Sequence, residues 1–282
     1  MVFYELSFDI ELSDEVYLFL EKRAPFGWEE EDNRGITTIK LYFSSLKDAE
    51  RFKKDLALSF CVHADIVKKD SSLWEKSWKE HFKPIVVAGE FLVIPPWEWK
   101  RHKNSSLKKI IIYPQMAFGT GHHPTTYLCL ESISYLVKTN KVPKGSLFLD
   151  VGTGSGILSF GCKMFGLKGI GIDIDENALK NAKLNKKLNR IKKDILFVLG
   201  DISSLKGKFK LILANIQANF HITHGKRLIE LLEPDGWLVL SGMVLEQKEK
   251  IESFYKSFDV KGPIMLFKEG WITLLWQKYG KG

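Results

Sequence analysis

The sequence predicts an α/β protein, in which a mostly parallel β-sheet with helices on both faces follows a small α+β domain. Three observations support this fold class. Strand and helix patterns alternate from about residue 145, two strand patterns without a helix between them close the chain, and the first 70 residues carry a separate βαββαβ pattern. With 282 residues, of which 45% are apolar and 27% charged, the chain is long enough for two domains with their own cores.

The first domain, residues 1–70, is expected to be a small ferredoxin-like sandwich. An alternating apolar strand at 2–10 leads to a helix from Ser13, and a second strand at 36–43 leads to a helix from Ser45. Short strands fit residues 26–29 and 62–68 and complete the βαββαβ order.

Residues 71–84 are expected to form a linker helix that ends before Pro84, because Leu73, Trp74, Trp78 and Phe82 recur at helical intervals. The second domain, residues 85–282, then begins with strands at 85–94 and 109–113. Pro95-Pro96-Trp97 and a lysine-rich surface loop at 100–109 separate the two strands.

The remaining elements alternate as a wound sheet requires. Strands are predicted at 146–150, 169–173, 195–199, 209–214 and 236–241, and helices at 156–165, 176–188, 219–232 and 245–257. The closing runs, 263–267 and 271–277, are joined through Glu269-Gly270 and should form an antiparallel hairpin.

Charge is unevenly distributed along the chain. Residues 1–60 contain 8 Lys+Arg and 13 Asp+Glu, whereas residues 61–282 contain 34 and 21, which gives −5 and then +13. A basic body can bind nucleic acid by releasing counterions, but lysine enrichment also occurs in heat-stable proteins that bind none. Direct contact with RNA therefore stays an open alternative.

The sequence carries no signal for membrane insertion or export. No run of about 18 apolar residues occurs, and the start Met1-Val2-Phe3-Tyr4 is not that of a secretory leader, so we expect a cytoplasmic protein. The three cysteines, Cys61, Cys129 and Cys162, are widely separated in apolar surroundings, and we expect buried free thiols rather than disulfides or a zinc cluster.

A glycine-rich loop stands where the strand at 146–150 must turn into a helix. Its sequence, Asp150-Val151-Gly152-Thr153-Gly154-Ser155-Gly156, has small residues that let a ligand approach the backbone. The G-x-G-x-G core differs from the G-x-G-x-x-G of dinucleotide folds and suits the methionyl part of S-adenosylmethionine better. The alternative is a merely tight turn.

Three acidic residues follow the next two strands. Asp173, 21 residues beyond Gly152, can accept both ribose hydroxyls of an adenosine. Asp175 is expected to cap the following helix. Asp201 could accept from the adenine amino group, or could be an ordinary turn aspartate.

Asn215 ends the fourth strand of the sheet, at the carboxyl edge where ligands bind in open α/β sheets. It is predicted to lie beside the reacting group of the donor, with helix capping as the alternative. The loop Met116 to Thr126 could cover the cofactor, and its adjacent His122 and His123 suggest a loop or capping role. No metal is expected, because no carboxylate or cysteine lies at ligand spacing.

These motifs resemble those of the ribosomal protein L-eleven methyltransferase family. The resemblance covers most of the chain and depends chiefly on residues 118–126, 150–158 and 171–175, together with Ala214-Asn215-Ile216, the linker from Trp74 to Pro84, and Pro95-Pro96-Trp97. Gln217 departs from the leucine that the family usually has after Asn-Ile.

The resemblance implies a fold, a cofactor and a substrate. The fold is a seven-stranded, Rossmann-like class I methyltransferase domain behind a small N-terminal domain that recognises the substrate. The implied reaction transfers methyl groups from S-adenosylmethionine to lysine side chains and the N-terminal amine of a large-subunit ribosomal protein, either free or on assembling ribosomes. The acidic run Glu29-Glu30-Glu31-Asp32 could face such a basic partner, or could be a solvated loop.

The residues expected to bind the donor are Phe118, Thr126, Asp150, Gly152, Gly154, Asp173, Asp201 and Asn215, and Asn215 is also the predicted catalytic residue. Because the donor is already activated, the main task is to hold a neutral amine in line with the methyl group, without a dedicated general base. An RNA or small-molecule methyltransferase is the competing enzyme, and an RNA-binding protein that lost turnover is the non-enzymatic alternative.

Overall fold

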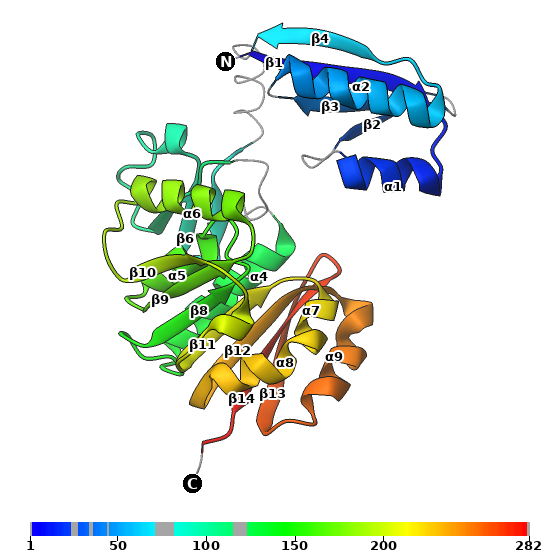
Figure 1. Cartoon of the computed structure of the whole chain (residues 1–282). Coiled ribbons are helices and arrows are strands. Elements are labelled where there is room, and N and C mark those ends of the chain that lie inside the picture. Colours follow the sequence, from blue (N-terminus) through cyan, green and yellow to red (C-terminus); the bar gives the residue numbers. More distant parts are fainter. Residues whose placement is uncertain are drawn as a thin grey trace. The chain divides into compact units, whose positions relative to one another are not determined.

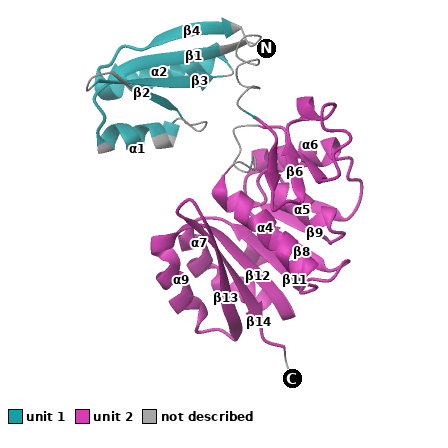
Figure 2. Cartoon of the chain, turned by 180° about the vertical axis from the view of Figure 1, so that it is seen from behind, with its two compact units in different colours: residues 1–82 teal, residues 83–282 magenta. Residues whose placement is uncertain are grey.

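The computed structural model describes residues 2–23, 28–33, 36–43, 45–70, 82–114 and 123–280. The chain divides into two compact units, residues 1–82 and 83–282, which Figure 2 colours separately. The linker helix expected at 71–84 lies almost wholly outside the described residues. None of the helices in the described ranges is both long and apolar enough to cross a membrane.

Unit 1 is a four-stranded antiparallel sheet with two helices. Its elements are β1 (Val2–Ile10), α1 (Asp14–Arg23), β2 (Glu29–Asn33), β3 (Ile36–Phe43), α2 (Leu46–Phe60) and β4 (Asp65–Asp70), and the strand order is β2-β3-β1-β4. Ser45 starts α2 by accepting a hydrogen bond from the Asp48 N–H at 3.2 Å. Alternate residues of β1 and β3, such as Leu6 and Ile39, pack against both helices to form the core.

Two expectations in unit 1 are wrong. The strand expected at 26–29 is β2, which runs from Glu29 to Asn33, so Trp28 precedes it. Cys61 is exposed rather than buried, because it lies just past the end of α2 and takes a left-handed conformation with φ 53°. Its N–H donates to the Ala57 carbonyl and so closes the helix. Cys129 and Cys162 are buried free thiols, and burial raises the pKa of Cys129 to about 12.

Unit 2 is built on a seven-stranded sheet in the order β10-β9-β8-β11-β12-β14-β13 (Figure 1). The parallel strands are β8 (Leu147–Val151), β9 (Lys168–Asp173), β10 (Ile195–Leu199), β11 (Phe209–Asn215) and β12 (Leu232–Val244). The closing strands β13 (Val260–Lys268) and β14 (Trp271–Lys278) form the predicted hairpin, and β14 pairs antiparallel to β12.

Helices cover both faces of this sheet, as the alternation predicted. The helices α4 (Pro124–Lys138), α5 (Ile157–Met164) and α6 (Glu176–Leu188) contribute to one core, and α7 (Ala218–Thr223), α8 (Gly225–Leu231) and α9 (Lys248–Tyr255) to the other. Along β11, Leu211 and Leu213 face the first core while Ile212 and Ala214 face the second. The strand β11 is therefore apolar on both sides, as a buried strand of a parallel sheet requires.

Three elements differ from the sequence-based predictions. The strand expected at 85–94 is a hairpin of β5 (Ile85–Val87) and β6 (Phe91–Ile94), because Ala88 and Gly89 both take positive φ at the turn. With β7 (Lys108–Ile111), these strands form a separate three-stranded sheet. The helix expected at 219–232 is divided into α7 and α8 at His224, and α4 was not predicted as a helix.

Candidate functional site

A cavity of about 590 Å³ opens at the carboxyl edge of the seven-stranded sheet, where ligands bind in open α/β folds. The ends of β8, β9, β11 and β12, the first turn of α4 and the start of β14 supply its walls. The lining residues are His123, Thr125, Thr126, Gly152, Thr153, Gly154, Ile157, Leu158, Asp173, Asp175, Ala178, Asn215, Ile216, Gln217, Gly242 and Trp271.

The glycine loop provides bare main chain to this cavity. Gly152, Gly154 and Gly156 have φ values of 64°, 53° and 83°, a left-handed conformation that other residues adopt at a cost. A Cβ at Gly152 would lie 2.8 Å from Ile216 Cδ1, across the cavity wall. The left-handed backbone therefore favours glycine at position 152, and a Cβ there would also displace the end of the Ile216 side chain.

Asp150 organises the loop from beneath. Its side chain is 1% exposed, and its Oδ2 accepts hydrogen bonds from Thr153 Oγ1 at 2.7 Å, Ser159 Oγ at 2.7 Å and the Ser159 N–H at 3.1 Å. Burial raises the pKa of Asp150 to about 6, although these hydrogen bonds oppose the shift. Asp150 is not among the lining residues, so the structure gives it a positioning role, and a direct contact with the donor stays a prediction.

Asp173 ends β9 at the rim of the cavity and joins the glycine loop. Its Oδ2 accepts a hydrogen bond from the Gly154 N–H at 2.9 Å, and its Oδ1 accepts one from the Asp175 N–H at 3.0 Å. These bonds fix the plane of the carboxylate, and each oxygen keeps further acceptor capacity for a ligand hydroxyl. The carboxylate of Asp173 is thus oriented so that it can accept hydrogen bonds from the hydroxyls of a ligand.

The two other predicted carboxylates cap helices. Asp175 accepts from the Asn177 N–H at 2.8 Å and starts α6, as expected. Asp201 accepts from the Ser203 N–H at 2.8 Å, and its hydrogen bonds with Ser203 lower its pKa. Asp201 is exposed and is not among the lining residues, so its contact with adenine also stays a prediction.

Asn215 and Thr126 meet across the cavity from different elements. Asn215 ends β11 and Thr126 lies in the first turn of α4; the Asn215 Nδ2 donates to Thr126 Oγ1 at 3.5 Å. The Oδ1 of Asn215 is buried and has no hydrogen-bond partner among the described residues. Asn215 does not cap α7, because Gln217 occupies that position. A buried acceptor without a partner costs free energy, which a ligand N–H or O–H would recover.

The loop before α4 is only partly described. Phe118 and His122 lie within residues 115–122, outside the described ranges, so their predicted contacts cannot be placed. His123 has the predicted capping role, since its Nδ1 accepts from the Thr125 N–H at 3.3 Å. Its ring also packs edge-on against Trp271, with 4.6 Å between ring centroids. Burial lowers the pKa of His123 and so favours its neutral form.

Sequence patterns missed three residues of the cavity wall, namely Ala178, Gly242 and Trp271. Gly242 could have been found, because it follows the carboxyl end of a predicted strand; a Cβ there would lie 2.4 Å from the Ile216 carbonyl oxygen. Trp271 could not have been found from the sequence, because it reaches this edge only through the antiparallel pairing of β14 with β12. No cluster of metal-ligating side chains occurs in the described part of the chain.

The cavity fits S-adenosylmethionine in its chemistry. Left-handed glycines allow close approach to the backbone, the carboxylate of Asp173 is fixed and can accept hydrogen bonds from a ribose diol, and the buried Asn215 Oδ1 is a further acceptor. The seven-stranded order with a closing hairpin and this cavity together define an S-adenosylmethionine-dependent class I methyltransferase.

Comparison with known proteins then gives the family. The family model "Ribosomal protein L11 methyltransferase (PrmA)" matches residues 7–279, so the chain belongs to the ribosomal protein L11 methyltransferase family. A ribosomal protein L11 methyltransferase of Staphylococcus carnosus is 32% identical over 253 residues, which cover 85% of this chain and 79% of that protein. One from Staphylococcus haemolyticus is 34% identical over 254 residues, with the same coverage.

A solved structure agrees with the fold. The crystal structure of a ribosomal protein L11 methylase from Lactobacillus delbrueckii subsp. bulgaricus has a TM-score of 0.64 and 28% identity; it covers 70% of this chain and 100% of that chain.

Proposed function

We propose that this methyltransferase modifies amino groups of a large-subunit ribosomal protein, at lysine side chains and the N-terminal amine, in the cytoplasm. The family match over residues 7–279 carries the proposal, and the place of Asn215 in the wall of the donor cavity supports it. The substrate would be the ribosomal protein, either free or on assembling ribosomes. Within the site, Gly152, Gly154, Asp173 and Thr126 would hold the donor, and Asp150 would position the loop.

When bound, S-adenosylmethionine supplies a methyl group already activated on a sulfonium. The protein's own task is to present a neutral amine, since a lysine ammonium with pKa near 10.4 has no free electron pair. A low-dielectric cavity that already holds a cation favours the neutral amine. The buried Oδ1 of Asn215 would accept one amine N–H and orient the nitrogen. A single contact leaves the amine free to rotate, as repeated methylation of one nitrogen requires.

We do not assign His123 a role as general base. Its Nδ1 accepts the Thr125 N–H at 3.3 Å and lies 2.7 Å from Thr125 Oγ1, so this nitrogen is engaged in capping α4. The other titratable groups of the cavity wall, Asp173 and Asp175, accept backbone N–H bonds. We therefore expect the amine to lose its proton to water before transfer, so that the transfer rate rises with pH until the amine is neutral.

We further propose that unit 1 is a ferredoxin-like domain that recognises the protein substrate. Its βαββαβ element order and its strand order β2-β3-β1-β4 support the first part. Its acidic strand β2 supports the second: Glu29 accepts from Tyr42 Oη and Glu31 pairs with Lys40 on the face of the sheet away from the core. Such a surface suits a basic ribosomal protein.

The substrate test uses the full chain with methyl-labelled donor and separated ribosomal proteins and ribosomal RNA. Label is expected in one large-subunit protein, at lysine and N-terminal amines identified by mass spectrometry. Label found only in RNA would overturn the substrate assignment, and no label in any fraction would overturn the activity itself.

The role of Asn215 is tested by two replacements of similar size. Asn215→Leu removes the acceptor and is expected to lower kcat about 100-fold or more, because one oriented contact at a reacting group is worth about that much. Asn215→Asp retains an acceptor and should keep more of the activity. Equal losses in both variants would show that the Oδ1 acceptor is not what the reaction needs.

A further inference from the structure

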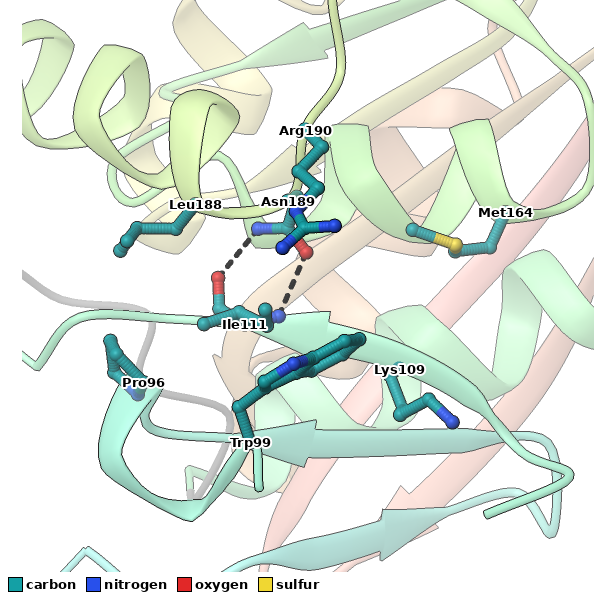
Figure 3. Close-up of a pocket in the computed structure, with 8 residues that line it drawn as sticks. All are labelled: Pro96, Trp99, Lys109, Ile111, Met164, Leu188, Asn189 and Arg190. Atoms are coloured by element: carbon teal, nitrogen blue, oxygen red, sulfur yellow. Dashed lines mark hydrogen bonds between the residues drawn. The ribbon is translucent and has the colours of Figure 1, made fainter. Parts of the chain in front are cut away.

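A second cavity in unit 2 lies between the three-stranded sheet and the C-terminal ends of α5 and α6 (Figure 3). Its volume is about 440 Å³, within the range of small-ligand sites. The lining residues are Pro96, Trp99, Lys109, Ile111, Met164, Leu188, Asn189 and Arg190, and none of them lines the donor cavity. We call it the Trp99 cavity.

The walls of the Trp99 cavity are fixed by hydrogen bonds and packing. The side chain of Asn189 bonds the backbone of Ile111 twice, through Nδ2 to the carbonyl at 2.6 Å and through Oδ1 from the N–H at 2.8 Å (Figure 3). Trp99 packs on the apolar cluster of Leu92, Ile94 and Ile111. A flat indole is therefore held at the wall of a preformed hollow.

Positive charge is dense in the two segments that border this cavity. Residues 96–109 contain five Lys+Arg and one Glu, and residues 186–194 contain five Lys+Arg and one Asp, so each segment carries +4. Their sum, +8, equals the net charge of all 282 residues. Outside these segments, residues 1–60 carry −5 and the remainder of residues 61–282 carries +5. The two segments, which together have 23 residues, therefore have the larger share of the +13 of residues 61–282.

Several of these cations are not neutralised locally. Lys109 Nζ donates to the carbonyls of Lys103 at 2.9 Å and Ser105 at 2.7 Å, and lies 5.8 Å from the Trp99 ring centroid. No carboxylate of the described residues lies within ion-pair distance of Lys109 or Arg190, whereas Lys108 pairs with Glu90. The positive charges of Lys109 and Arg190, which line the cavity, are therefore available to an anionic partner.

We propose that the Trp99 cavity and its two basic segments bind single-stranded RNA. One base would stack beside Trp99, and neighbouring phosphates would contact Arg190 and the lysines of the two segments. A strand of RNA offers both a flat aromatic group and closely spaced anions, which is the combination that this surface matches. The carboxylates of an acidic peptide would pair with the lysines and arginines, but they would not stack on the indole ring of Trp99. The proposal is independent of the substrate assignment above.

The test measures binding of a fluorescein-labelled oligouridine of about 12 nucleotides by anisotropy over a range of salt concentrations, using the full chain without donor. Trp99→Leu keeps an apolar side chain but loses the ring, and is expected to weaken binding about 10-fold, whereas Trp99→Phe should retain most of it. Arg190→Gly should lower the slope of log K against log salt by about 0.7, the value for one lost phosphate contact.

Arg190→Gly also separates binding from folding. Arg190 has φ 56° just past α6, where glycine is favoured, so the variant should keep or raise the thermal midpoint while it loses affinity. Lys256→Gln, at an exposed lysine outside both segments, is the charge-matched control and should bind as the wild type does. All variants should retain methyl transfer to free ribosomal protein.

Three results would overturn the proposal. The first is equal weakening by Lys256→Gln and Arg190→Gly, which would indicate binding by diffuse charge. The second is full retention of affinity in Trp99→Leu. The third is displacement of the RNA by adenosine monophosphate or polyglutamate as efficiently as by unlabelled oligouridine, which would assign the site to a free nucleotide or to an acidic protein.

Discussion

At the scale of single residues, the donor cavity depends on positions where a side chain would fill space or break a fixed geometry. The glycine loop, Asp173 and Asn215 were each predicted from their place after a strand, and the structure brings them to one cavity. A single sequence could not show which polar side chains already form hydrogen bonds within the protein. Asp150 and Asp201 look alike as candidates, yet one is buried beneath the loop and the other is an exposed cap.

The first prediction concerns Gly152. Gly152→Ala should lower the affinity for S-adenosylmethionine by about 10-fold or more, because the new methyl group would meet Ile216 Cδ1 at 2.8 Å in the cavity wall. Binding is measured by calorimetry.

Gly145→Ala is the matched control, since Gly145 has a similar left-handed φ of 87° but nothing within 4 Å of its added Cβ. It should lose some stability and keep its donor affinity. If both variants bind the donor equally well, close packing at position 152 does not shape the cavity.

At the scale of elements, the regular alternation of apolar strands and amphipathic helices was sufficient to predict the seven-stranded sheet and its closing hairpin. The sequence-based predictions were wrong where tertiary contacts determine the ends of a helix. A division between α7 and α8 cannot be seen locally; Gly225, which starts α8, lies so close to Phe254 of α9 that a Cβ would be 2.4 Å from its ring. The helix α4 follows a loop rich in glycine and threonine, which obscured its start at His123.

The element-scale prediction concerns His221, which connects three elements behind the cavity. Its Nε2 donates to the Ser241 carbonyl of β12 at 2.8 Å, and the Tyr255 hydroxyl of α9 donates to its carbonyl at 3.0 Å. Burial lowers the pKa of His221 to about 4. The unfolded chain therefore takes up the proton first as pH falls, so the free energy of unfolding should fall between about pH 6.5 and pH 4.

The change attributable to His221 is at most about 3 to 4 kcal/mol, from 1.36 kcal/mol for each pKa unit between 6.5 and about 4. Denaturant titrations of the wild type and His221→Gln should show a stability difference that shrinks by up to that amount on acidification. The comparison cancels the opposite effect of Asp150, whose raised pKa favours the folded state at low pH. A difference that stays constant with pH would mean that His221 is not kept neutral by burial; His63→Gln is the control for an exposed imidazole.

At the scale of the whole molecule, two compact units and an uneven charge distribution suggest separate tasks. The acidic first unit suits a basic protein, the cavity at the carboxyl edge of the sheet in the second unit suits the donor, and the basic segments around the Trp99 cavity suit RNA. The sequence showed the charge asymmetry at once. It could not show where the basic residues gather, because residues 96–109 and 186–194 are brought together only by the packing of β7 against the end of α6.

Neutralising the acidic strand tests the division of tasks. Glu29 and Glu31 share one face of the sheet, because alternate residues of a strand point to the same side. Replacing both with Gln removes two negative charges that would attract a basic protein, so KM for the ribosomal protein should rise several-fold at low salt. KM for the donor should not change. The effect should shrink as salt screens the attraction. Glu246→Gln with Glu249→Gln, which removes two exposed charges from unit 2, should leave both constants unchanged.

The central claim is that the cavity at the carboxyl edge of the sheet binds S-adenosylmethionine with Asp173 on its ribose. Calorimetric titration of the donor into the wild type, Asp173→Ala and the exposed-site control Asp65→Ala tests it most directly. We predict micromolar-range binding at one site for the wild type and Asp65→Ala, and an affinity at least about 10-fold lower for Asp173→Ala, since it loses charge-assisted hydrogen bonds. Unchanged affinity in Asp173→Ala, or no binding by the wild type, would contradict the account.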